Sequence, residues 1–122
     1  MTDNVNHPAH YEANGPFECI ELTEQYDFCL GNAIKYVWRH NDKGKPVEDL
    51  SKARWYVQRE IDRMGGSGIY VPDDDGQSAR LADIDFAHMA GFWHALDVGD
   101  LDLMKQAIQS RLDTLTKQED AA

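Results

Sequence analysis

An apolar stripe that begins just after Pro46 constrains the fold more than any other feature of the sequence. Its members recur every three to four residues: Val47, Leu50, Ala53, Val57, Ile61 and Met64. This spacing places one continuous apolar face on a helix. Pro46 suits a first helical turn, where a missing amide hydrogen costs nothing, and Gly65-Gly-Ser-Gly68 supplies an end. The stripe therefore predicts a long amphipathic helix whose apolar face other elements must cover.

The remaining periodic segments also predict helices. We expect a short helix over residues 17–26, with Phe17, Ile20 and Thr23 on one side, and a second helix from Phe28 or Gly31 to His40. A fourth helix is predicted from the spacing of Leu81, Ile84, His88, Phe92 and Ala95. A fifth, with Asp100 as its N-cap, is predicted from Leu101, Met104, Ile108, Leu112 and Leu115. The predicted fold is an all-α, small helical domain with an extended N-terminal arm.

The 122 residues are enough for one domain with a modest core. We divide the chain into an arm with three helices (1–64), a Gly- and Asp-rich loop (65–80) and a helical hairpin (81–118). The hairpin is expected to pack on the same domain or on a neighbouring subunit, and we expect a homo-oligomer. The acidic turn that ends at Gly76 lacks the alternating ligands of a calcium loop, so we expect it to be solvated.

Charge and composition exclude several classes of protein. The net charge of -10 argues against a protein that binds duplex nucleic acid, yet the first 64 residues hold 8 of the 12 Lys and Arg residues. No apolar run is long enough to span a membrane, and the first residues lack the pattern of a signal peptide, so we expect a cytoplasmic protein. Cys19 and Cys29 fit neither a zinc spacing nor a disulfide framework, and we expect two buried, reduced thiols.

A cluster of cations is the strongest indication of a binding site. Lys35 and Arg39 share a helix face, Lys43 and Lys45 follow in the next turn, and Lys52 comes one helix later. Such a group suits phosphate, because Arg and Lys bind its oxygens with charge-assisted hydrogen bonds. Helical salt bridges are the alternative. Four aromatic residues interleave with the cations and are expected either to stack on a nucleobase or to pack in the core: Tyr36, Trp38, Trp55 and Tyr56.

Two further groups suggest chemistry near this cluster. His7, His10 and Tyr11 lie in the arm, which is expected to fold over the cations and contact a ligand, to cap the domain, or to hold a metal with help from elsewhere. Glu18 and Glu21 lie three residues apart and could hold Mg²⁺ that bridges substrate phosphates. A solvated helix face is the alternative for the two glutamates.

Several spaced motifs between residues 5 and 64 resemble a known family. They are Asn6-His-Pro-Ala-His-Tyr11, Glu18-Cys-Ile-Glu21, Gly31-Asn-x-Ile-Lys-Tyr-x-Trp-Arg39, Lys43-Gly44 and Glu48-Asp-Leu-x-Lys-Ala-x-Trp-Tyr56. Together they resemble a family of small tailed-phage domains, largely of unknown function, that includes a deoxynucleoside monophosphate kinase without a Walker motif. The resemblance implies a nucleotide ligand, a location in the host cell cytoplasm and transfer of a phosphoryl group from a nucleoside triphosphate.

For such a kinase the expected catalytic residues are Lys35, Arg39 and Asp49, with Asp49 orienting Lys52 or the acceptor, and Mg²⁺ as cofactor at Glu18 and Glu21. The expected substrate-binding residues are His7, His10, Tyr11, Asn32, Lys35, Trp38, Arg39, Lys43, Lys45 and Lys52. Phosphoryl transfer needs little more than positioning and charge neutralisation, which these residue types supply.

Three other functions stay open at this point. The pair Glu18-x-x-Glu21 resembles half of the acidic signature of all-α, Mg²⁺-dependent nucleotide pyrophosphatases. A noncatalytic protein that sequesters a nucleotide signal would use the same cations and rings without any metal. An acidic helical surface such as the C-terminal half could instead mask a basic host protein.

Overall fold

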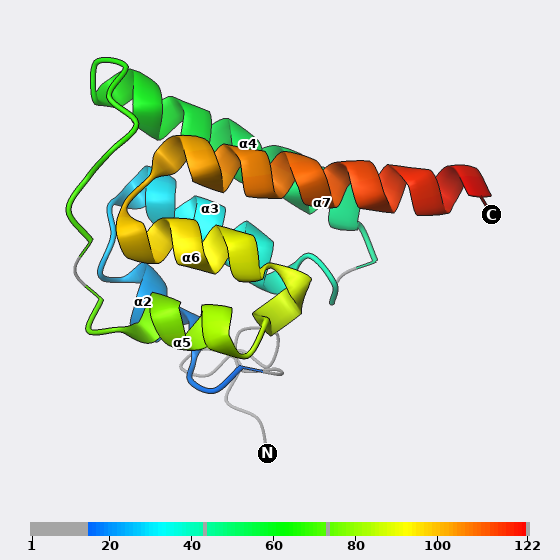
Figure 1. Ribbon diagram of the computed structural model, residues 1–122, viewed down its shortest axis with the longest axis horizontal. Coiled ribbons are helices and arrows are strands. Elements are labelled where there is room, and N and C mark those ends of the chain that lie inside the picture. Colours follow the sequence, from blue (N-terminus) through cyan, green and yellow to red (C-terminus); the bar gives the residue numbers. More distant parts are fainter. Residues whose placement is uncertain (1–14, 43, 73, 122) are drawn as a thin grey trace.

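The structure is a computed structural model that describes residues 15–42, 44–72 and 74–121. Within these residues the regular elements are helices, and Ile69 and Asp100 form an isolated antiparallel bridge. The helices are α2 (Cys19–Thr23), α3 (Phe28–Arg39), α4 (Pro46–Arg63), α5 (Gln77–Asp83), the 3₁₀ turn η1 (Phe86–His88), α6 (Ala90–Val98) and α7 (Leu101–Ala121). The prediction of an all-α fold is confirmed (Figure 1).

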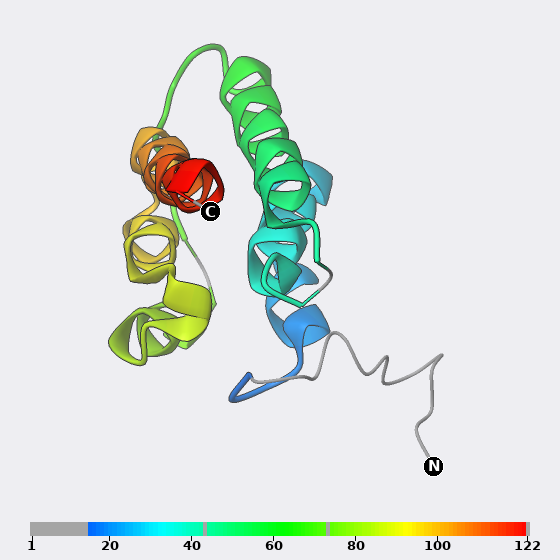
Figure 2. The same cartoon turned by 90° about the vertical axis from the view of Figure 1, so that its right-hand side faces the viewer.

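The helices form two layers with the core between them. One layer contains α2, α3 and α4, and the other contains α5, α6 and α7 (Figure 2). Helix α4 packs against both α3 and α7, while α6 packs against α5 and α7. Trp38 from the first layer and Trp93 from the second meet edge to face, with ring centroids 6.1 Å apart. None of the described helices is both long and apolar enough to cross a membrane.

Helix α4 forms as its sequence predicts. Pro46 occupies the first turn, and Glu48 and Asp49 lie beside the positive end of the helix dipole. Leu50, Ala53, Val57 and Ile61 are buried, and Val47 and Met64 are partly buried at the ends of the stripe. The stripe faces α3 and α7 of the same chain.

Helix α7 is the second long element and also follows its sequence pattern. The amide of Leu103 donates to Asp100 Oδ1 at 3.0 Å, so Asp100 caps the helix as predicted. Its apolar stripe is buried against α4 and α6, apart from the partly buried Leu115: Leu101, Met104, Ile108, Leu112 and Leu115. The stripe is therefore covered within one chain.

The prediction of a single fourth helix is wrong. The segment is divided into α5, η1 and α6, with positive φ angles at Asp85, Ala87 and His88. Two contacts fix the break: the Ala90 amide donates to Asp85 Oδ1 at 3.1 Å, and the Trp93 indole donates to the Phe86 carbonyl at 2.9 Å. The pattern misled because Ile84 and His88, which we placed on the apolar face, are exposed.

The predicted first helix is also shorter, and its buried side differs. Helix α2 ends at Thr23, and Asp27 begins α3 by accepting a hydrogen bond from the Leu30 amide at 3.0 Å. Cys19 and Leu22 are the buried residues of α2, whereas Ile20 is 51% exposed. Both cysteines are free and buried, as predicted.

The acidic turn is not uniformly solvated, contrary to expectation. Asp74 is buried and accepts hydrogen bonds from the Tyr26 hydroxyl at 2.6 Å, from the Ser78 hydroxyl and from the Ser78 amide at 3.4 Å. Burial and the contact with Asp74 raise the pKa of Tyr26. This network attaches the start of α5 to the segment that precedes α3.

Candidate functional site

Three cations surround the ring of Tyr36 on the outer side of α3 and α4. Lys35 Nζ lies 4.7 Å from the ring centroid, the Arg39 guanidinium carbon 4.9 Å and Lys52 Nζ 5.5 Å. Lys35 and Arg39 come from α3, and Lys52 comes from α4. We call this group the cation–tyrosine face. Its cations are held by the quadrupole of one ring, which attracts positive charge to its π surface.

Further aromatic rings support Tyr36. Tyr36 and Tyr56 are stacked, with centroids 6.1 Å apart and an interplanar angle of 15°. Phe28 and Trp55 each meet Tyr56 edge to face, at 6.0 and 5.1 Å. Phe28 is 73% exposed and Trp55 61% exposed. The surface thus offers open aromatic rings beside positive charge, although Phe28 was not among the residues predicted from the sequence.

Arg39 forms an ion pair with the buried carboxylate of Asp49. Arg39 Nη2 lies 3.7 Å from Asp49 Oδ1, and only 6% of the Asp49 side chain is exposed against 20% for Arg39. Arg39 Nε and Asp49 Oδ2 are both buried without a hydrogen-bond partner. Buried polar atoms normally have partners, so this pair has unused hydrogen-bonding capacity.

Lys45 and Lys52 pair with one carboxylate. Glu48 lies 3.8 Å from Lys45 Nζ and 3.5 Å from Lys52 Nζ, and all three side chains are about half exposed or more. Such surface pairs contribute little to stability. Lys35, Arg39, Lys45 and Lys52 carry four positive charges against two negative charges on Glu48 and Asp49, a net charge of +2. The salt bridges considered from the sequence exist, but they leave the group positive.

Trp38 lies in the core and not on the cation–tyrosine face. Its side chain is 2% exposed and contacts Phe17, Phe86 and Trp93. In this structure the ring has no open surface for a base. On α3, Trp38 therefore lies in the core and Tyr36 lies near the surface.

Glu18 and Glu21 form a capping box at the start of α2. The Glu18 amide donates to Glu21 Oε2 at 2.6 Å, which engages one oxygen of this carboxylate. Cys19, between them, lies close enough to Lys35 and Arg39 to feel their charges, although burial dominates and raises its pKa to about 12. In the described part of the chain, no three His, Cys, Asp or Glu side chains are arranged to hold a metal ion.

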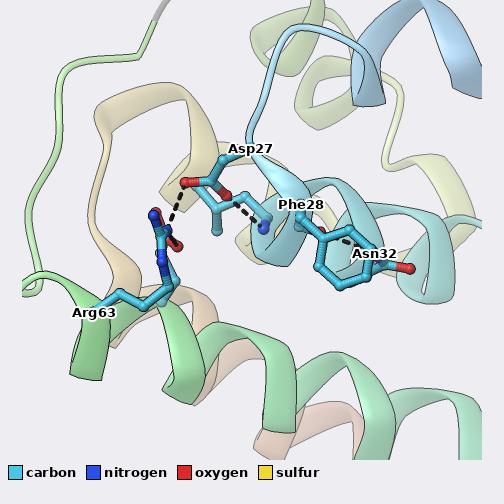
Figure 3. Close-up of polar contacts among 6 residues, drawn as sticks. Asp27, Phe28, Asn32 and Arg63 are labelled. Carbon is cyan, nitrogen blue, oxygen red and sulfur yellow. Dashed lines mark hydrogen bonds and ion pairs between the residues drawn. The ribbon is translucent and has the colours of Figure 1, made fainter.

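Asn32 lies near a second polar cluster that the sequence did not indicate. Its side chain donates to the Phe28 carbonyl at 2.8 Å, one turn back along α3. Figure 3 shows Asp27 at the start of this helix, reaching Arg63 of α4. Arg63 Nη1 lies 3.2 Å from Asp27 Oδ2 and 2.6 Å from Oε1 of the buried Glu60. Burial and a hydrogen bond to Asp27 raise the pKa of Glu60. These contacts join the start of α3 to the end of α4.

His40 is buried directly after α3 and was also missed. Its Nδ1 contacts the Val37 carbonyl at 2.6 Å, and Arg111 Nε of α7 donates to its Nε2 at 3.3 Å. This assigns the proton to Nδ1 of a neutral ring. Burial lowers the pKa of His40, and the charge of Arg111 acts in the same direction. His40 thus links the end of α3 to α7.

The other predicted ligand contacts, His7, His10, Tyr11 and Lys43, lie outside the described residues. Among the described residues, the structure brings Lys35, Arg39 and Lys52 together, with Asp49 behind Arg39 and Lys45 beside Glu48. Glu18 caps the neighbouring helix α2 and Glu21 lies in its first turn, while Cys19 of this helix is close to Lys35.

Comparison with known proteins gives a match to one family model over part of the chain. Residues 5–58 match the model of a family described as a protein of unknown function (DUF3310). The match covers the N-terminal segment, α2, α3 and most of α4, so it includes the whole cation–tyrosine face and ends before α5, α6 and α7. No curated protein and no solved structure matches the chain significantly.

Proposed function

We propose that the protein binds a nucleotide through its phosphates at the cation–tyrosine face and acts as a nucleoside monophosphate kinase. The arrangement of Lys35, Arg39 and Lys52 around one ring is the observation that carries the proposal. Three like charges so close together repel one another, and a bound phosphate would replace that repulsion with attraction. The surplus positive charge is local to this face of an otherwise acidic chain.

The pairing of Arg39 supports a phosphate ligand. Asp49 holds the guanidinium at one end, while 20% of the Arg39 side chain stays exposed. A guanidinium presents its donors as a planar fork that matches two phosphate oxygens. Asp49 then acts as a positioning residue for Arg39 from its buried place beside the guanidinium.

The chemistry of phosphoryl transfer fits these residue types. The reaction depends on alignment of the two oxygens and on neutralisation of the charge that spreads over the transferred group. Lys35, Arg39 and Lys52 would supply that neutralisation from the protein. Glu18 and Glu21 would hold Mg²⁺, which usually keeps only one or two carboxylate ligands and supplies further positive charge at the phosphates.

A single incubation separates the kinase from the alternatives. The pure protein is mixed with Mg²⁺ and a pool of nucleoside mono- and triphosphates, and the soluble and retained nucleotides are identified by mass spectrometry. New diphosphates support the kinase and name its acceptor. Pyrophosphate released from a triphosphate alone would identify a pyrophosphatase, and an unaltered nucleotide retained by the protein would identify a sequestering protein.

The matched variant is Lys35→Gln/Arg39→Gln, which keeps side-chain length and removes both charges. It should lose diphosphate formation, with an unchanged helical circular dichroism spectrum. Wild-type diphosphate formation in this variant would overturn the proposal. No nucleotide affinity in the wild-type protein would also overturn it and would favour a protein-masking role.

A further inference from the structure

A hollow of about 420 Å³ lies between α4 and α7, and its Trp55 is linked to the cation–tyrosine face through Tyr56, which stacks on Tyr36. It is lined by Ser51, Arg54, Trp55, Gln58, Lys105 and Gln109. Its volume falls in the range of sites that hold small ligands. We call it the α4–α7 hollow. Lys105 and Gln109 lie on α7, so the hollow extends beyond the residues that match the family.

The cations of the hollow have neutral partners. Lys105 Nζ donates to Gln58 Oε1 at 2.6 Å, and Arg54 Nη1 donates to Gln109 Oε1. The amide groups of the same glutamines donate to Asp62 and Asp113, each at 2.9 Å, and this turns their oxygens toward the cations. Within the described residues, neither Arg54 nor Lys105 forms an ion pair. Two positive charges are therefore held in place by amide oxygens and not by direct contact with a carboxylate.

Trp55 gives the hollow an open aromatic wall. Its indole is 61% exposed, and the edge-to-face contact with Tyr56 fixes its position on α4. An exposed indole favours stacking with another ring, and stacking on a base contributes about 1–3 kcal/mol in complexes with nucleic acids. An exposed indole, two cations with amide partners and a ligand-sized space thus occur together.

We infer that the α4–α7 hollow binds a mononucleotide, with the base stacked on Trp55 and the phosphates contacted by Arg54 and Lys105. Only a ligand with both a flat ring and negative charge uses the whole set of residues. This binding does not depend on the cation–tyrosine face. Its use as the second nucleotide site of a kinase rests on the proposed function, since phosphoryl transfer between nucleotides needs two ligands on adjoining surfaces.

Tryptophan emission offers a direct test. Trp38 and Trp93 are buried, so quenching by a ligand reports on Trp55. Each of the four deoxynucleoside triphosphates is titrated into the full-length protein, with correction for absorbance. We expect saturable quenching by at least one of them. In Arg54→Gln/Lys105→Gln the affinity should fall about 100-fold, because a hydrogen bond to a charged group is worth roughly tenfold or more in binding.

The controls separate this inference from the proposed function. Arg80→Gln/Lys117→Gln removes the same charge from exposed positions that do not line the hollow and should quench like the wild type. Lys35→Gln/Arg39→Gln should also keep the quenching, even if diphosphate formation is lost.

If the Arg54 and Lys105 variant fails to fold, calorimetry with Trp55→Ala replaces it and should show a loss of at least tenfold in affinity. No quenching in the wild type, unchanged affinity in the Arg54 and Lys105 variant, or quenching by a single-stranded oligonucleotide and not by mononucleotides would overturn the inference.

Discussion

Tyr26 and Tyr36 are the same residue type in opposite electrostatic settings. Tyr26 donates its hydroxyl to the buried carboxylate of Asp74, which also accepts from Ser78. Tyr36 instead presents its ring to three cations near the surface. The network at Asp74 is closed within the chain, whereas the cation–tyrosine face keeps surplus positive charge on partly exposed side chains. A closed network stabilises the fold, and an open one has capacity left for a ligand.

The largest effect should come from the charges of the cation–tyrosine face. Lys35→Gln/Arg39→Gln is expected to weaken nucleotide binding at this face about 100-fold, because two charge-assisted contacts with phosphate are lost. Isothermal titration calorimetry measures the affinity. Urea unfolding of the same variant should also show some loss of stability, because the buried Asp49 loses its partner Arg39. Unchanged affinity at this face would contradict the comparison between the two tyrosines.

The closed network should respond in the opposite way. Tyr26→Phe removes one donor to the buried Asp74 and is expected to lower the free energy of unfolding by about 1–2 kcal/mol, with nucleotide affinity unchanged. Tyr36→Phe is the matched control, because it removes a hydroxyl and keeps the ring, and its stability should be close to that of the wild type. Equal losses in the two variants would contradict a special role for the Asp74 network.

The ring of Tyr36 should matter by a smaller amount. Tyr36→Leu removes the π surface that holds the three cations and is expected to weaken nucleotide binding a few-fold, since an exposed cation–π contact is worth about 0.5–1 kcal/mol. Tyr36→Phe should bind like the wild type. If the Phe and Leu variants bind equally, the ring does not organise the cations.

The pH dependence of stability should come from two buried groups, His40 and Glu60, and not from the cation–tyrosine face. Below the usual pKa of 6.5, the unfolded chain protonates His40 while the folded chain still keeps it neutral, so stability falls as the pH drops from 6.5 to the lowered pKa. Glu60 has a raised pKa and acts in the other direction as the pH approaches 4.5. His40→Asn should therefore be less destabilised by acid than the wild type in urea unfolding between these values. An identical pH profile for the two proteins would exclude His40 as the cause.

The long helices were predictable because their apolar residues recur with one regular helical period. The stripes of α4 and α7 are regular, and Pro46 and Asp100 mark where they begin. The break between α5 and α6 was not predictable, because it carries neither Pro nor a helix-breaking Gly between residues 84 and 89. Contacts such as the one from the Trp93 indole to the Phe86 carbonyl hold it in place, and local pattern does not encode them.

The candidate site was predictable in residue type but not in arrangement. Cations four residues apart on α3 had to share a face, yet nothing local indicated that Lys52 would approach the same ring as Lys35. The spacing of aromatic residues could not tell which side of α3 would be buried, and Trp38 proved to be in the core. Asp74 lies between two other aspartates, so the sequence did not distinguish it from them. Its partner Tyr26 lies 48 residues away in the sequence.

Nucleotide binding at the cation–tyrosine face is tested most directly by side-chain ¹⁵N NMR of the arginines during titration with a nucleoside triphosphate. We expect the Arg39 Nε–H signal to shift on binding, because the exposed part of the same guanidinium would contact phosphate. The signal of Arg63, which is paired with Asp27 and Glu60, should stay in place. An Arg39 signal that does not move at saturating nucleotide would contradict phosphate binding at this face.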